Sequence, residues 1–552
     1  MRSLGAPGAA VAVILLLSGS PGCQSSLPSA AQRQGASAAS LATLGPALAE
    51  SIETLARNRA RPEALVRSER SHRRLLADHA PALLSEATPP RPAAGVRRID
   101  ALRDPAAFSA IKPVIRPGNG AAGLERAGIG LPVVARLPAP RDPNAPRAGY
   151  HLPATLVVQP GTEPRDRLSG ARGPADGATN PVPASPDGPA AAPVRGCCQA
   201  ALADATIVEQ VPTALGTLPV AMDLQAPLDA TGATGPRLGA AVANLLWPAH
   251  FSGEPRIVFL QPFEPDKTPL VLVHGLLSTP GVWTPLVTQL LADPRIRDCC
   301  QIWFFYYPTG QPVPLSALQL REALDAAVAH TGLDRPMILI GHSMGGILSR
   351  AQVSRIGPAR AEAILPGVSE LPAYSRVRRA LIFEPRTDVS RAIFLFTPHR
   401  GSRLASNAAG AIVVRLIRLP DTLLSEMERA LGTLAGHTST RLPTSIQGLS
   451  PRSRFLRTLD ATTAAVPVHS IVGDRGRGDG TRGSDGVVPV ASARLAGAES
   501  ELVVPTGHGG FHHPDAVAEL KRIILLGVTQ HPAAGTMATA ADAALFMPAG
   551  RF

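Results

Sequence analysis

The chain has 552 residues, enough for two to four domains, and 45% of them are hydrophobic, which suits a globular core. Its formal net charge of +12 invites a nucleic-acid-binding interpretation. However, lysine occurs only at positions 112, 267 and 521, and the arginines are scattered among alanine and proline. No basic stripe with interleaved aromatic residues is present, so we attribute the charge to coding bias and expect no nucleic-acid partner.

The first residues have the pattern of an export signal. Arg2 precedes an apolar run over residues 9–17, which is too short to cross a bilayer, and small residues then lead to Cys23. This end resembles the bacterial lipoprotein signal, in which such a cysteine carries lipid, although Ser20 and Pro21 depart from that pattern. We expect residues 1–22 to be the signal, Cys23 to be lipidated, and the protein to be exported to the cell envelope with a lipid anchor in the membrane.

The chain has five cysteines, an odd number. Setting Cys23 aside for lipid leaves two adjacent pairs, Cys197-Cys198 and Cys299-Cys300. An exported protein can oxidise such pairs, and a cross-link between the two predicted regions that carry them is one outcome. Four buried free thiols are the other outcome, and the sequence leaves both open.

Two regions precede the clearest fold pattern. Residues 23–99 begin as a Ser/Ala-rich tether and then show helical spacing of apolar residues. Residues 100–262 hold short β-rich pieces between Pro/Gly segments, which predicts a small accessory β region with a linker. The expected helices cover residues 41–60, 62–78 and 236–246, and the expected strands cover residues 131–137, 154–158, 205–208, 218–224 and 256–260.

Strands and helices alternate over residues 263–530, which predicts an α/β fold with a parallel sheet and helices on both faces. Residues 401–459 hold amphipathic pieces without a strand, as expected of a helical cap over an apolar substrate site or of an ordinary helical excursion. Residues 531–552 are predicted to be a tail. The expected strands cover residues 270–273, 301–306, 337–340, 392–396, 466–472 and 501–504, and the expected helices cover residues 282–292, 315–329, 344–354 and 515–526.

A serine flanked by glycines follows the buried strand at residues 337–340, where the sequence reads G-H-S-M-G. Gly341 and Gly345 permit a sharp reversal from strand to helix, because a Cβ at either position would strike the neighbouring strand or helix. Ser343 then stands at the tip of the turn, beside a helix N-terminus that favours negative charge. The strand, turn and helix together indicate that Ser343 is a catalytic nucleophile.

Several segments around this turn resemble the α/β-hydrolase fold and, within it, the bacterial lipases and esterases, over residues 269–526. Serine, acid and histidine follow one another in the order that this fold uses. The matching segments are Val273-His274-Gly275-Leu276-Leu277, Gly341-His342-Ser343-Met344-Gly345, Thr397-Pro398-His399-Arg400-Gly401-Ser402, Ser484-Asp485-Gly486-Val487-Val488-Pro489 and Gly507-His508-Gly509-Gly510.

A serine nucleophile needs an imidazole to take its proton, and His508 is the candidate because flanking glycines let its loop reach over the sheet. His512 and His513 are rivals, but they adjoin a proline at the start of the last helix, where capping or packing is a more natural role. His274 is expected to shape the oxyanion turn, and His342 to pack beside the nucleophile.

The acid has two candidates in one loop, and Asp485 is preferred over Asp474 because the apolar residues after it can pin its backbone. The backbone N–H groups of Leu276 and Met344 are the expected oxyanion donors. The spacing of Asp474, Asp479 and Asp485 matches no EF-hand, so we expect no metal and no cofactor.

These features predict a serine hydrolase that cleaves carboxylic esters, or lipids with an apolar acyl chain, through an acyl-enzyme. An acyltransferase using the same residues is the near alternative, if an alcohol instead of water takes the acyl group. A non-catalytic envelope lipoprotein with a hydrolase-like scaffold is an alternative of another class, against which the intact serine, acid and histidine argue. Chain-length preference and oligomeric state are not readable from the sequence.

Overall fold

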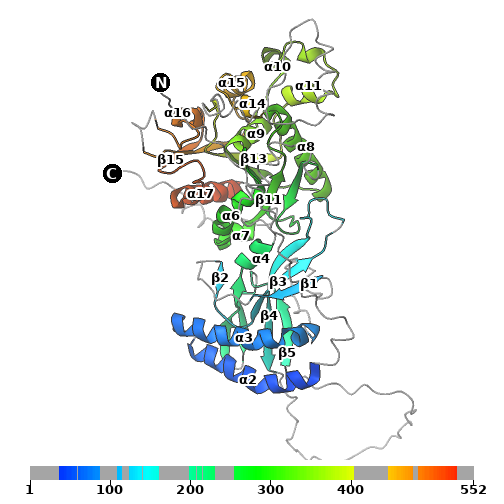
Figure 1. The fold of residues 1–552 in the computed structure, drawn as a ribbon, viewed down its shortest axis with the longest axis vertical. Coiled ribbons are helices and arrows are strands. Elements are labelled where there is room, and N and C mark those ends of the chain that lie inside the picture. Colours follow the sequence, from blue (N-terminus) through cyan, green and yellow to red (C-terminus); the bar gives the residue numbers. More distant parts are fainter. Residues whose placement is uncertain are drawn as a thin grey trace, which may run out of the picture.

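The computed structural model describes residues 37–58, 60–86, 109–114, 124–139, 141–160, 198–206, 208–213, 215–230, 254–402, 445–476 and 483–530. Within them, a helix-covered β region lies at one end and an α/β region at the other (Figure 1). Cys23, the Pro/Gly-rich stretch after residue 160, the expected helix over 236–246, most of the expected cap and the tail lie outside the described residues.

The accessory region is a four-stranded antiparallel sheet in the order β1-β3-β4-β5. Two helices, α2 (Ser37–Asn58) and α3 (Pro62–Glu86), pack against each other and cover one face of this sheet (Figure 1). Their buried leucines, Leu44, Leu48 and Leu76, join the core of the sheet. The strands are β1 (Ala110–Pro113), β3 (Leu131–Leu137), β4 (Tyr150–Pro160) and β5 (Cys198–Ala203).

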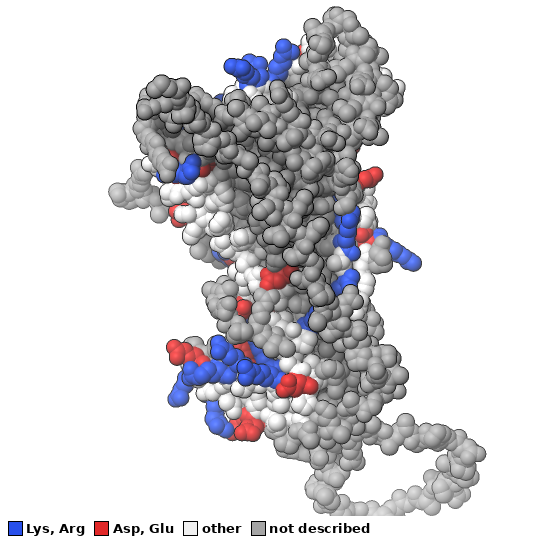
Figure 2. Space-filling model, viewed as in Figure 1, with Lys and Arg blue, Asp and Glu red and all other residues white. Residues whose placement is uncertain are grey.

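The outward surfaces of α2 and α3 are charged with both signs. Figure 2 shows basic and acidic side chains next to one another over these helices, and Glu53 pairs with Arg57 at 2.7 Å one turn along α2. Each helix is therefore amphipathic, with its apolar side on the sheet. No helix in the described part of the chain is both long and apolar enough to cross a bilayer.

His72 links both helices to the sheet from a fully buried position. Its Nε2 accepts a hydrogen bond from the Gly130 N–H at 3.1 Å, so its Nδ1 carries the proton and donates to the Ser51 hydroxyl at 2.9 Å. Burial and then the charge of Arg73 lower the pKa of His72 to about 4. The imidazole is therefore neutral at pH 7, and its role is to link α2 and α3 to the sheet by hydrogen bonds.

Short elements complete the accessory region. The predicted strand over residues 205–208 is wrong, because Ala205 and Thr206 form a turn in which the Asp204 carboxylate accepts hydrogen bonds from the Thr206 N–H and hydroxyl. The remaining elements are β2 (Glu125–Arg126), β6 (Gln210–Thr213), β7 (Gly216–Pro219), β8 (Met222–Asp223) and α4 (Gln225–Ala230).

The α/β region is built on a seven-stranded sheet in the order β15-β14-β13-β12-β10-β11-β9. All neighbouring strands are parallel except β9, which runs antiparallel to β11 at the edge. The sheet is therefore mixed, whereas the sequence predicted a parallel sheet. The strands are β9 (Arg256–Phe259), β10 (Thr268–Val273), β11 (Cys300–Tyr306), β12 (Met337–His342), β13 (Val389–Leu395), β14 (Val468–Gly473) and β15 (Ser500–Val504).

Alternate residues of the central strands enter two different cores. Val271 and Leu339 join one cluster with α8 and α9, whereas Leu272 and Ile340 join the other with α6, α7 and α17. This period of two explains why both strands are apolar along their whole length. The helices are η4 (Pro280–Trp283), α6 (Thr284–Leu291), α7 (Pro294–Cys299), α8 (Val313–Thr331), α9 (Met344–Gln352), α10 (Pro358–Ile364), η5 (Val368–Glu370), α11 (Arg376–Leu381), α14 (Ser445–Gly448), α15 (Arg454–Asp460), α16 (Val490–Ala493) and α17 (Pro514–Gln530).

The two regions are joined at the edge strand β9. Asn144, which is 4% exposed, accepts a hydrogen bond from the Phe259 N–H at its backbone carbonyl, at 2.8 Å. Its side-chain Nδ2 donates to the Ile257 carbonyl, also at 2.8 Å. The loop between β3 and β4 therefore occupies part of the hydrogen-bonding edge that a further strand would use.

Cys299 and Cys300, at the junction of α7 and β11, are free thiols whose sulfur atoms lie 3.3 Å apart. The hydrogen bond between them lowers the pKa of Cys299 and raises the pKa of Cys300, whereas burial raises the pKa of both thiols. The side chains of Cys197 and Cys198 lie outside the described residues, so a cross-link between the pairs stays a prediction.

Candidate active site

Ser343 lies at the sharp turn between β12 and α9. Its backbone has φ 55° and ψ −124°, a conformation that residues other than glycine rarely adopt. The Ser343 N–H donates to the Leu395 carbonyl of β13 at 2.9 Å, and this bond helps to hold the strained turn against the sheet. The Ser343 side chain is thereby raised above the carboxyl end of the sheet in a site where the residue is 8% exposed.

The glycines around the turn are required by close backbone contacts. A Cβ on Gly345 would lie 2.0 Å from the Val273 carbonyl oxygen, and one on Gly341 would lie 2.5 Å from the Gly345 carbonyl oxygen. A side chain at either position would push α9 away from the sheet, as the sequence predicted. Gly346 is equally constrained, because its Cβ would lie 1.9 Å from the Thr397 hydroxyl oxygen.

The structure brings Ser343, His508 and Asp485 together in one line of hydrogen bonds. His508 Nε2 lies 2.9 Å from Ser343 Oγ, and His508 Nδ1 lies 2.6 Å from Asp485 Oδ2. Because the carboxylate can only accept, Nδ1 carries the proton, and the lone pair on Nε2 faces the serine hydroxyl. The imidazole is thus in the tautomer that can take the proton of Ser343.

Asp485 is fixed by its own loop. Its Oδ1 accepts hydrogen bonds from the N–H groups of Val487 and Val488, at 2.8 and 2.7 Å, and its side chain is 1% exposed. Gly473, the last residue of β14, makes room for it, since a Cβ there would lie 2.9 Å from the Asp485 Cβ. The carboxylate therefore reaches the end of β14 although it follows that strand by several residues.

The rival residues have other surroundings. Asp474 Oδ1 accepts a hydrogen bond from the Gly476 N–H at 3.0 Å in its own turn. His512 is exposed, and His513 Nδ1 lies 3.7 Å from Asp515. Within the described ranges, no group of three or more His, Cys, Asp or Glu side chains is placed to hold a metal ion.

The His342 side chain holds the backbone of His508 in place, a role that the sequence pattern did not reveal. The Nε2–H of His342 donates to the His508 carbonyl at 2.9 Å, and the ring lies against Trp283 and Phe511. Burial and then the charge of His508 lower the pKa of His342 to about 3. His342 therefore stays neutral and places no second positive charge beside His508 when His508 is protonated.

The turn after β10 lies directly against the nucleophile. A Cβ on Gly275 would be 2.9 Å from the Ser343 Cβ, which places the next residue, Leu276, beside the reaction site. Met344 is the first residue of α9, so its N–H has no partner within the helix. Both expected oxyanion donors thus border Ser343.

His274 shapes this turn and is not placed to act as a base. It is fully buried and stacks on the Tyr307 ring, whose hydroxyl donates to the His274 carbonyl at 2.7 Å. The Nδ1–H of His274 donates to the Gly275 carbonyl at 3.1 Å. Burial lowers the pKa of His274 to about 4, so it remains neutral.

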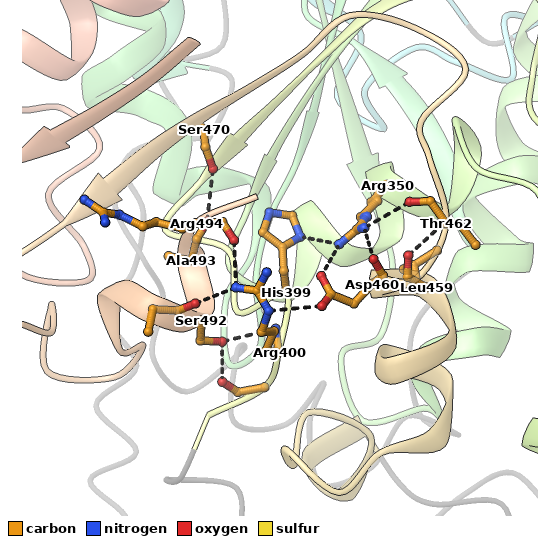
Figure 3. A network of polar contacts seen from close by, with 12 residues as sticks. Arg350, His399, Arg400, Leu459, Asp460, Thr462, Ser470, Ser492, Ala493 and Arg494 are labelled. Atoms are coloured by element: carbon orange, nitrogen blue, oxygen red, sulfur yellow. Dashed lines mark hydrogen bonds and ion pairs between the residues drawn. The ribbon is translucent and has the colours of Figure 1, made fainter. Parts of the chain in front are cut away.

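The turn Thr397 to Ser402 is held by a polar network that includes the nucleophile helix (Figure 3). Arg350 of α9, which is 2% exposed, donates to His399 Nδ1 at 3.2 Å and pairs with Asp460 of α15 at 3.4 Å. The guanidinium also donates to the carbonyls of Asp460 and Thr462. The buried charge of Arg350 is therefore compensated, and α9 is tied to α15.

The same turn is tied to the acid loop on its other side. Arg400 pairs with Asp460 at 3.0 Å (Figure 3). It also donates to the Ala491 carbonyl at 2.6 Å. The Ser402 hydroxyl donates to the carbonyl of Val487, two residues after Asp485. These contacts position the loop of the acid relative to the helix of the nucleophile.

Comparison with known proteins bears on the fold of this region. Residues 270–520 match the family described as the alpha/beta hydrolase family, and this part of the chain has the fold of that family. No curated protein matches the chain.

Similar solved structures include a Bacillus licheniformis lipase, BlEst2 in mature form, with 19% identity over 50% of this chain and 99% of that one and a TM-score of 0.32. A Staphylococcus hyicus lipase is 15% identical over 49% of this chain and 97% of its own, also with a TM-score of 0.32. EstA from Clostridium botulinum is 15% identical over 48% and 88%, with a TM-score of 0.30.

Proposed function

We propose that the protein is a serine hydrolase that cleaves carboxylic esters through an acyl-enzyme intermediate. The observation that carries this proposal is the line of hydrogen bonds from Asp485 through His508 to Ser343, at 2.6 and 2.9 Å. The match of residues 270–520 to the alpha/beta hydrolase family supports it.

In the first half-reaction, Ser343 Oγ attacks the ester carbonyl carbon while His508 Nε2 takes its proton. Asp485 stabilises the imidazolium that forms and keeps Nδ1 protonated. His508 then gives the proton to the leaving alkoxide oxygen, so the alcohol departs and the acyl group stays on Ser343. Water repeats the sequence in the second half-reaction and releases the carboxylic acid.

Negative charge develops on the carbonyl oxygen in each tetrahedral intermediate. The N–H groups of Leu276 and Met344 are the proposed donors, and each such donor contributes about 3 kcal/mol in serine hydrolases. The N-terminus of α9 adds a favourable dipole at the same place. Fixed backbone donors need no reorganisation when the charge appears.

A fluorophosphonate probe tests the nucleophile directly. It should label the wild-type protein and not Ser343→Ala. The matched control is Ser349→Ala, the same substitution at a fully buried serine of the adjoining helix α9, which should still be labelled. Equal labelling of Ser343→Ala and the wild type would refute the assignment.

The ester class is tested with p-nitrophenyl esters of increasing chain length, with and without competing alcohols. Net release of free acid supports the hydrolase. Transfer of most acyl groups to the alcohol in water would favour the acyltransferase alternative instead. No release from any ester by labelled, folded protein would count against both.

We also propose that the protein is exported and carries lipid on Cys23, which would bring the hydrolase to a membrane surface with ester or lipid substrates. The short apolar run at residues 9–17 and the cysteine that follows it support this proposal.

A further inference from the structure

A cavity of about 90 Å³ lies between the accessory region and the hydrolase domain. Strand β4 and helix α4 line it from one side, and the β9–β10 connection with α6 and α7 lines it from the other. A single water needs roughly 10–15 Å³, so the space accepts a small organic molecule. Rim residues such as Gln261 are partly exposed, which leaves a way in from solvent.

Arg297 of α7 lines this cavity and lacks a counter-charge. It is 8% exposed, its Nη1 donates to the Leu291 carbonyl at 2.8 Å, and its Nε has no hydrogen-bond partner. None of the ion pairs among the described residues includes it. A second positive group, Arg126, lies near enough to feel this charge: burial lowers the pKa of Arg126, Glu209 opposes that shift, and the charge of Arg297 lowers the pKa further.

Among the described residues, neither carboxylate that borders the cavity forms an ion pair with Arg297. Glu264 pairs with Lys267 at 3.1 Å, and Asp204 Oδ1 accepts two hydrogen bonds from Thr206. Removing an unpaired guanidinium from water is unfavourable, and an anion in the cavity would offset that cost. The second cationic candidate on the rim, His151, has its pKa lowered by burial and by Arg136 and Lys112, so it adds no charge at pH 7.

The rest of the wall is mostly apolar, with five leucines: Leu152, Leu224, Leu228, Leu260 and Leu291. We propose that this cavity binds a short-chain carboxylate, whose carboxylate group pairs with Arg297 and whose alkyl chain packs among these leucines. A guanidinium offers two parallel N–H donors to a carboxylate, which suits this recognition. An inorganic anion would leave the apolar wall unused.

This site is distinct from the candidate active site. Lys267 precedes β10, whereas the oxyanion turn follows the same strand at its other end, about 20 Å away at 3.3 Å per residue. Because both regions supply the wall, a bound carboxylate stabilises their junction. Carboxylic acids of this kind are products of ester hydrolysis. The interpretation of the ligand as a reaction product rests on the proposed function, whereas the binding of a carboxylate at Arg297 does not.

Thermal unfolding of the full-length Ser343→Ala protein tests the site without turnover. Butyrate at tens of millimolar should raise Tm by about 2–4 °C, and the neutral isostere butyramide and sodium chloride at equal ionic strength should not. Arg297→Gln should lose the butyrate shift. Arg295→Gln is the matched control: it lies on the same helix with a side chain 68% exposed, and should keep the shift.

A second variant covers the case in which Arg297→Gln fails to fold. Leu291→Trp adds bulk to the cavity wall and keeps Arg297, and calorimetric titration should then show butyrate affinity at least tenfold weaker. Undiminished binding in both variants, or an equal shift with butyramide or chloride, would overturn the proposal. If the wild type hydrolyses no ester yet shows an Arg297-dependent butyrate shift, the carboxylate site stands and the proposed hydrolase activity fails.

Discussion

The isosteric replacement Asp485→Asn should nearly abolish ester hydrolysis, for a reason that lies in the two backbone donors at Oδ1. An amide must keep its oxygen toward the N–H groups of Val487 and Val488, which lie at 2.8 and 2.7 Å. Its NH₂ group then faces His508 and donates to Nδ1. The imidazole is forced to carry its proton on Nε2, where it cannot accept the proton of Ser343.

Turning the amide round would leave two buried donors unpaired, at about 1–3 kcal/mol each. At 1.4 kcal/mol per factor of ten, holding His508 in the unproductive tautomer alone lowers kcat by on the order of 30- to 20,000-fold. The loss of about 10⁴ seen when a serine protease loses this carboxylate lies within that interval. The assay is kcat on one p-nitrophenyl ester, after circular dichroism shows that the variant is folded.

Asp474→Asn is the matched control, since its carboxylate accepts from Gly476 within its own turn, and it should change kcat by less than about threefold. A loss below tenfold in folded Asp485→Asn would refute the tautomer argument. A large loss confined to Asp474→Asn would reverse the choice of acid, and equal losses would assign the effect to the loop as a whole.

Three further predictions concern folding and location. Gly345→Ala should lower the free energy of unfolding by about 3 kcal/mol or more and remove most activity, because its Cβ would lie 2.0 Å from the Val273 oxygen. Gly357→Ala, which has open space around its Cβ, should keep its stability in urea unfolding and its activity in ester assays. Burial lowers the folded pKa of His72 from 6.5 to about 4, so its contribution to stability is complete above pH 6.5. Up to about 3 kcal/mol of the free energy of unfolding is lost as the pH falls towards 4. Urea unfolding at several pH values should show this drop, and His72→Gln should reduce it. Labelled palmitate should enter the wild type and not Cys23→Ser, and equal labelling or equal membrane partitioning would contradict the lipid anchor.

Much of the hydrolase fold was predictable because its strands are buried on both faces. The run at residues 337–340 can be neither a surface strand nor a long helix, and it forms most of β12. The short helices α10 and α11 were missed, since six or seven residues carry too little periodicity to stand out. The false strand at residues 205–208 came from β-branched residues whose preference is overridden by the turn that Asp204 stabilises.

At the candidate site, local patterns indicated Ser343, Asp485 and His508, and the structure places them within hydrogen-bond distance; their catalytic roles stay a prediction. The supporting contacts were not visible in the sequence. His342 holds the backbone of a residue far along the chain, and Arg350 meets Asp460 across a separation that no motif spans. Such partners depend on how strands order themselves in the sheet, which short motifs do not encode.

The contact of Asn144 with β9 also bears on association between copies of the chain. An open edge strand offers unpaired N–H and C=O groups to any passing chain, and proteins commonly cover such edges. Here the cover comes from the loop before β4, through the bonds to Ile257 and Phe259. A fragment cut to the family match at residues 270–520 would lose both β9 and its cover, leaving β11 as a bare, strongly apolar edge. We therefore expect that fragment to aggregate where the longer chain remains dispersed.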